Sequence, residues 1–254
     1  MRYLCADIGN THVKLGLYAE GSLSVQASFP VADATAACDW IAVHAAGADG
    51  AILAASGAVP ECLEQAVQSS ATRYERLMCD TPLPIENRYR TPRTLGPDRL
   101  AAAAGAYARH GGQPLLVVDA GTAITFDTVT ASGAYLGGTI SPGLRMRFEA
   151  LHRYAAHLPL VEPGGQEGLV GHTTAEAIAL GVQNGILAEI DYYVREFGSI
   201  FGKPTVVLTG GDMFFLMNRL KNTAKYIIFA EQNLVLDGLY SIIRRIVSPD
   251  RKES

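Results

Sequence analysis

The feature that most constrains this chain is a pattern that occurs twice. In the first copy, an apolar segment at 3–8 leads into Asp7-Ile8-Gly9-Asn10-Thr11, and a predicted hairpin follows. In the second copy, an apolar segment at 115–118 leads into Asp119-Ala120-Gly121-Thr122, and a second predicted hairpin follows. A strand–turn–hairpin unit used twice in 254 residues predicts two related α/β domains that face each other.

The rest of the chain predicts alternating helices and strands. Helices are expected at 33–46, 60–69, 100–109, 173–197 and 231–246, with a shorter helix after Pro142-Gly143. Further strands are expected at 51–55, 74–79, 203–209 and 226–229, and proline-containing loops at 81–94 and 159–171. We place the domain boundary near Gly112, so that the domains span 1–112 and 113–230.

Composition excludes several classes of protein. The 25 acidic and 21 basic residues give a net charge of −4, which argues against a nucleic-acid-binding protein. No apolar run approaches the roughly 18 residues of a membrane-spanning helix. Asp7 interrupts the first apolar segment before a secretory signal can form, so a cytoplasmic location is expected. The four cysteines form no CxxC pair, which disfavours a zinc or thioredoxin-type site.

The two repeated turns are suited to binding phosphate. A glycine lets the backbone approach a ligand closely, and successive N–H groups with a threonine hydroxyl can surround phosphate oxygens. Asp7, at the first turn, is placed to hold Mg²⁺ directly or through water. Each turn taken alone is more simply interpreted as an ordinary hairpin turn. Two facing turns of this kind favour a nucleotide-phosphate clamp.

Two further motifs have both a functional and a structural interpretation. Gly210-Gly211-Asp212 follows a predicted strand and suits an adenosine resting on backbone, or simply a strand-to-helix turn. Gly96-Pro97-Asp98-Arg99 is typical of a helix start. There Asp98 could accept the proton of an attacking hydroxyl and Arg99 could bind an anion, which is the chemistry that phosphoryl transfer needs.

In this order, the motifs resemble those of the type III pantothenate kinases. The resemblance runs from Asp7 to about Asp212, and no position that carries chemistry departs from the family pattern. Besides the two turns, it includes Tyr89-x-x-Pro92-x-x-x-Gly96-x-Asp98-Arg99, Gly137-Gly138-Thr139-Ile140-x-Pro142-Gly143 and Thr174-x-x-Ala177-Ile178.

The resemblance implies a fold and an activity. The expected fold is that of the actin, Hsp70 and sugar-kinase superfamily. It has two ribonuclease-H-like domains with mixed five-stranded sheets flanked by helices, and an active site in the cleft between them. The final helix, about 231–254, is expected to pack back on the first domain. The expected reaction is ATP-dependent phosphorylation of pantothenate to 4'-phosphopantothenate, the first step of coenzyme A biosynthesis, in a homodimeric kinase.

The resemblance also implies site residues. ATP phosphates would be bound by Asp7, Ile8, Gly9, Asn10, Thr11, His12, Val13 and Lys14, with Thr122 also contacting ATP. Pantothenate would be bound by Tyr89, Gly96, Pro97, Asp98, Arg99 and Thr174, with Asp98 as the catalytic proton acceptor. Asp119 would hold a monovalent cation, K⁺ or NH₄⁺, and Asp7 would lie near the Mg²⁺ that accompanies the phosphates.

Two alternative hypotheses remain. One is a kinase or phosphatase of the same superfamily that acts on another small molecule or polyphosphate. The other is a nucleotide-binding regulatory protein, because the family is similar to an accessory factor that supports transcription. Intact Asp98, Asp119 and Thr122 argue against a lapsed catalytic site.

Overall fold

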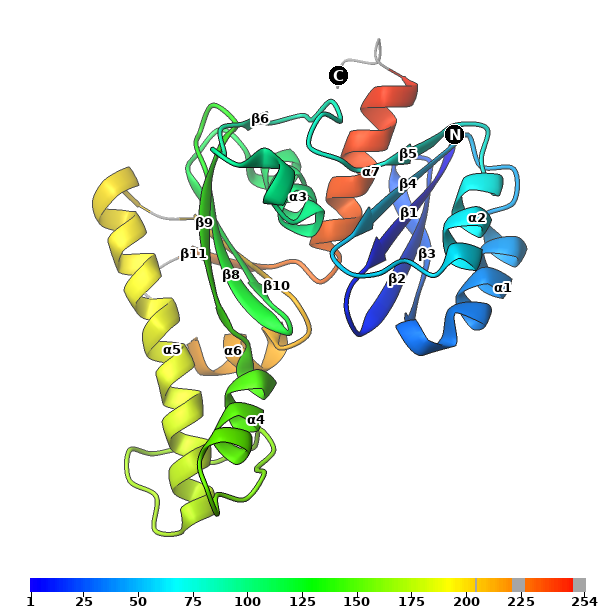
Figure 1. The fold of residues 1–254 in the computed structure, drawn as a ribbon. Helices are drawn as coiled ribbons and strands as arrows, with labels where there is room; N and C mark the ends of the chain where they lie inside the picture. The colour runs from blue at the N-terminus through cyan, green and yellow to red at the C-terminus, as the bar shows by residue number, and fades with distance from the viewer. Residues whose placement is uncertain (204, 221–226, 249–254) are drawn as a thin grey trace. The chain divides into compact units, whose positions relative to one another are not determined.

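The computed structural model describes residues 1–203, 205–220 and 227–248, and its chain divides into two compact units (Figure 1). Unit 1 contains Met1–Gly112, Thr130–Leu136 and the chain from Asn233 onward. Unit 2 contains Gln113–Val129 and Gly137–Gln232. Each unit contains most of one sheet and the helices that pack on it.

Unit 1 is built on a five-stranded sheet. Its strand order is β3-β2-β1-β4-β5, from β1 (Arg2–Ile8), β2 (His12–Ala19), β3 (Ser22–Pro30), β4 (Gly50–Ala55) and β5 (Tyr74–Arg76). β1 and β2 are antiparallel, whereas β1, β4 and β5 run parallel. β1 and β4 are almost wholly buried because both faces of the central strands are covered, while β3 alternates between exposed and half-buried residues as a solvated strand does.

Helices cover both faces of this sheet. α1 (Ala34–His44) and α2 (Glu61–Ser69) share a core with Leu4, Ala6 and Ile8. α7 (Leu234–Val247) packs on the opposite face of the sheet, where the Tyr240 ring contacts the rings of Tyr3 on β1 and Tyr18 on β2. α3 (Pro97–His110) lies against α7.

Most of the second sheet belongs to unit 2. Its order is β11-β10-β7-β8-β9, from β7 (Leu115–Ala120), β8 (Ala123–Val129), β9 (Ala134–Pro142), β10 (Thr205–Thr209) and β11 (Ile227–Ala230). The helices are α4 (Leu144–Tyr154), α5 (Thr174–Phe201) and α6 (Met213–Leu220). The Thr173 hydroxyl caps α5 by accepting from Glu176 N at 3.2 Å. One core cluster joins β7, β8 and β10 to all three helices.

One strand lies where the sequence predicts a loop. β6 (Glu86–Asn87) pairs with Ala134 and Tyr135, the residues of β9 that belong to unit 1, and adds a sixth strand to the expected five. Its two residues lie within a proline-containing segment, and a strand this short leaves no alternating pattern to detect. Its partner holds it in place, since Glu86 N donates to Gly133 O at 2.8 Å and Arg88 N donates to Tyr135 O at 2.9 Å.

Other boundaries differ by a few residues. The strand predicted at 74–79 ends at Arg76, and the long helix continues four residues further than predicted, to Phe201. Residue 226 of the last predicted strand and residues 249–254 of the predicted C-terminal segment lie outside the described residues. Within the described ranges, no helix is both long and apolar enough to span a bilayer.

Candidate active site

The first repeated turn joins β1 to β2 in unit 1. Asp7, the second-last residue of β1, is buried and pairs in register with Lys14 of β2. The turn closes where Gly9 N donates to His12 O at 2.9 Å. A Cβ on Gly57 would lie 3.0 Å from Asn10 Oδ1, so the neighbouring loop also approaches the turn closely. The predicted ATP-binding segment is therefore a tight, exposed turn with a buried carboxylate at its base.

The second group in unit 1 lies at the start of α3. Gly96 is the N-cap residue and Pro97 is the first helical residue, as the sequence predicts. Asp98 Oδ1 accepts from Arg99 N at 2.9 Å, and a Cβ on Gly96 would collide with this oxygen. Glycine at 96 therefore leaves the room that the Asp98 carboxylate occupies.

Tyr89 joins this group from the extended segment that precedes α3. The Arg99 guanidinium carbon lies 5.9 Å from the centre of the Tyr89 ring, which is within range of a cation–π interaction. Arg99 is only 7% exposed. The structure thus brings together five of the six predicted substrate-site residues, Tyr89, Gly96, Pro97, Asp98 and Arg99. They include an acid, a buried cation and an aromatic ring.

The second repeated turn closes the end of β7 in unit 2. Gly121 N donates to Ala123 O at 3.0 Å, and Gly143 N donates to Thr122 O at 3.1 Å. A Cβ on Gly143 would collide with Gly121 O and Thr122 O. Gly210 adopts φ +95 and packs against Ala120, so only glycine fits there without strain. Asp119 and Thr122 are therefore held among three closely packed backbone segments.

Asp212 belongs to the same part of unit 2. Asp212 N donates to Ala120 O at 3.0 Å, which ties the Gly-Gly-Asp segment to the end of β7. Burial raises the pKa of the Asp212 carboxyl above its usual range, and the charge of Arg145 partly opposes this. A half-buried acid with a perturbed pKa is common at functional sites. The sequence analysis included Asp212 in the Gly210-Gly211-Asp212 motif, but it predicted only that the backbone there could contact an adenosine.

Arg147 is a supporting residue that the sequence analysis missed. From α4, Arg147 donates to Pro142 O at 2.8 Å and to Ser141 Oγ at 3.0 Å, and it forms an ion pair with Glu189 of α5. These contacts hold the chain immediately before Gly143, which packs on the Thr122 turn. A lone arginine in a helical pattern carries no signal of such a role. Thr174, the last predicted substrate residue, is exposed at the start of α5.

Solved structures with the same architecture define the class of fold. A Campylobacter jejuni protein assigned to the Baf family of transcriptional activators has a TM-score of 0.62, 22% identity and coverage of 96% of this chain and 98% of its own. A Sinorhizobium meliloti protein assigned as a 2-dehydro-3-deoxygalactonokinase has a TM-score of 0.61, 17% identity and coverage of 97% and 99%. The activator of 2-hydroxyisocaproyl-CoA dehydratase from Clostridium difficile, with bound ADPNP, has a TM-score of 0.57, 12% identity and full coverage of both chains. The fold is that of the actin-like ATPases and sugar kinases, as predicted.

Sequence comparison then defines the family within this class. The type III pantothenate kinase family model matches residues 3–196, and the chain belongs to this family. The type III pantothenate kinase of Flavobacterium johnsoniae is 38% identical over 240 residues, covering 93% of this chain and 95% of its own length. That of Porphyromonas gingivalis is 38% identical over 243 residues, covering 94% and 97%. The predicted family is confirmed.

Proposed function

We propose that this protein transfers the γ-phosphoryl group of ATP to pantothenate, giving 4'-phosphopantothenate for coenzyme A biosynthesis. The observation that carries this proposal is the grouping of Tyr89, Asp98 and Arg99 at the start of α3 in a chain of this family. Pantothenate has one carboxylate and one primary hydroxyl, so a site with one cation and one acid matches its chemistry. Gly96, Pro97 and Thr174 complete the proposed acceptor site.

In the proposed reaction, the substrate hydroxyl oxygen forms a bond to the γ-phosphorus. The bond from that phosphorus to the bridging oxygen breaks in line, and ADP leaves. The hydroxyl proton passes to the Asp98 carboxylate. Asp98 lies in the first turn of α3, where the positive end of the helix dipole favours negative charge. Proton acceptance is only one contribution, because positioning and charge stabilisation dominate phosphoryl transfer.

The proposed ATP site uses residues 7–14 and Thr122. The exposed turn residues 10–12 lie where their backbone can approach phosphate oxygens, and the Lys14 ammonium supplies positive charge. The Asp7 carboxylate at the base of this turn fits a Mg²⁺ ion, which prefers one or two carboxylates together with substrate phosphates. Bound Mg²⁺ would neutralise charge on the phosphates.

Asp119 is the proposed ligand of K⁺ or NH₄⁺. It is the second-last residue of β7 and pairs with Thr125 of β8 and Thr209 of β10, so a carboxylate, threonine side chains and backbone carbonyls occur together there. This oxygen-rich set suits a monovalent cation, which would offset the negative charge that develops during transfer.

The molecular organisation is also part of the proposal. We infer that residues 1–112 and 113–230 form the two ribonuclease-H-like domains, and that the final helix belongs with the first of them. We further infer a cytoplasmic homodimer that binds neither nucleic acid nor membrane.

The test is an assay of ADP release with Mg-ATP, pantothenate and K⁺. Two controls omit pantothenate or replace K⁺ by Na⁺. We expect ADP release that requires pantothenate and is much slower in Na⁺ alone. Full activity in Na⁺ would contradict the cation site at Asp119. ATP binding without pantothenate-dependent release would contradict the proposed activity and favour a regulatory protein or another acceptor.

A further inference from the structure

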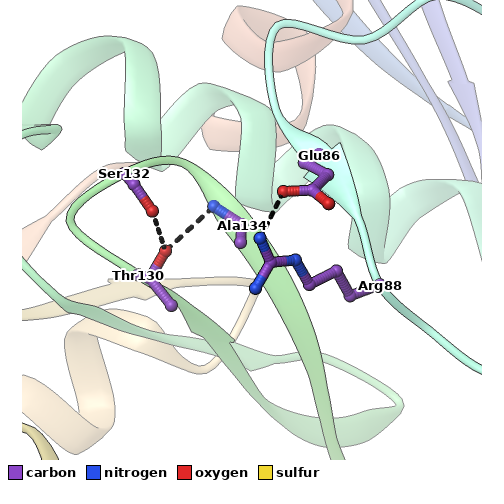
Figure 2. Close-up of polar contacts among 5 residues, drawn as sticks. All are labelled: Glu86, Arg88, Thr130, Ser132 and Ala134. Atoms are coloured by element: carbon purple, nitrogen blue, oxygen red, sulfur yellow. Dashed lines mark hydrogen bonds and ion pairs between the residues drawn. The ribbon is translucent and has the colours of Figure 1, made fainter.

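The segment before α3 presents two faces. From Glu86 to Arg90 the residues alternate between exposed and half-buried, and β6 pairing fixes this alternation. Glu86 and Arg88 form an exposed ion pair at 2.7 Å (Figure 2). Beside them, Thr130 Oγ1 accepts from Ala134 N, which holds the turn that leads into the part of β9 that pairs with β6. Asn87 and Tyr89 therefore share the opposite face.

The orientation of the Asn87 amide is determined by its neighbour. Asn87 Oδ1 accepts from Tyr89 N at 3.0 Å, and an amide rotated by 180° would set two donors against each other. The Nδ2 group therefore points away from this contact. It is buried, and it is one of two buried side-chain nitrogen or oxygen atoms without a hydrogen-bond partner in the described part of the chain.

Such a donor requires an explanation. Leaving a buried polar group unpaired is unfavourable, and most such groups in proteins have a partner. Asn87 lies two residues from Tyr89 on the same face, and Tyr89 contacts Arg99 in the proposed acceptor site. The missing partner is thus expected in the ligand of that site.

We propose that Asn87 contacts the substrate, its Nδ2 group donating a hydrogen bond to the amide carbonyl of pantothenate. This inference rests on the proposed function. A neutral donor fits the neutral amide oxygen, whereas the pantothenate carboxylate requires a charged partner, which Arg99 supplies. Because Nδ2 is covered in the free protein, substrate binding includes a small side-chain movement in this segment.

The substitution Asn87→Asp isolates the donor. Aspartate keeps an oxygen that accepts from Tyr89 N but lacks the N–H group, whereas Asn87→Ala removes both. We expect each variant to raise the KM for pantothenate about 10- to 100-fold, with the KM for ATP unchanged. Glu86→Gln, on the exposed face of the same strand, is the matched control and is expected to resemble the wild type. Circular dichroism melts check that all variants fold.

Pantothenyl alcohol, which has a hydroxyl in place of the carboxylate, separates the donor from charge effects. Asn87→Asp cannot repel this neutral analogue, so an equal loss on both substrates supports a contact with the amide carbonyl. A loss confined to pantothenate would overturn the assignment. A KM for pantothenate in Asn87→Asp equal to that of the wild type would also overturn the assignment. The contact from Tyr89 N would then be the only one at this position that matters. If the wild type itself shows no pantothenate-dependent ADP release, the proposed function fails and this assignment fails with it.

Discussion

At the scale of single residues, Asp98 is the side chain on which the proposed chemistry depends. Asparagine keeps its size and the contact with Arg99 N but cannot accept a proton. We expect Asp98→Asn to lower kcat about 100- to 10,000-fold, the usual contribution of a general base, while ATP binding is unchanged. Steady-state kinetics together with calorimetric titration of ATP measure both. Near-normal turnover would show that the proton goes elsewhere.

Asp212 illustrates a residue whose charge costs stability. Its folded-state pKa is raised by burial, so between the unfolded and folded pKa values the folded protein holds a proton that the unfolded chain has lost. The contribution of Asp212 to stability is therefore present at low pH and falls as pH rises through this interval. We expect Asp212→Asn to be more stable than the wild type at pH 7, with the difference shrinking toward pH 4. Urea unfolding at pH 7 and at pH 4 measures the difference in the free energy of unfolding between the variant and the wild type. A difference that stays constant between these pH values would contradict a raised pKa at Asp212.

At the scale of elements, the α3–α7 contact depends on two glycines. A Cβ on Gly238 would collide with Ala101 O, and a Cβ on Gly105 would collide with Leu234 O. We expect Gly238→Ala to destabilise the protein by about 1–3 kcal/mol or more, because backbone cannot move aside cheaply. Denaturant midpoints measure the loss.

The matched control is Gly185→Ala on α5. Nothing lies within 4 Å of its added Cβ, and alanine is the better helix former by about 1 kcal/mol. We therefore expect Gly185→Ala to be neutral or stabilising. Equal losses in the two variants would show that helix packing is not the cause.

At the scale of the whole molecule, the proposed homodimer is the feature to test. Tyr192 and Ile200 of α5 are 51% and 71% exposed, so both side chains are available for contact with a second chain. We expect light scattering to give twice the 27.0 kDa of one chain. Ile200→Asp should shift this mass toward one chain. Val43→Asp, on α1 of unit 1 and 75% exposed, should leave it unchanged. A monomeric wild type would contradict the dimer.

Most of the architecture could be predicted from local signals. Each repeated turn follows a buried apolar strand and precedes a second strand, and α3 begins where Gly96-Pro97 predicts. β6 could not be predicted, because a two-residue strand exists only through its pairing with Ala134 and Tyr135. The role of Arg147 was hidden for a similar reason, since its partners lie on the end of β9 and on α5.

The sequence by itself determined the class of fold, the family and the candidate residues, because each rests on motifs contained in short stretches of chain. Only the tertiary structure decided which groups meet. It placed the Arg99 guanidinium beside the Tyr89 ring, Gly143 against the Thr122 turn and Asn87 Nδ2 in a buried position without a partner among the described residues. Burial and hydrogen bonding between distant segments depend on packing, and no local pattern of residues records them.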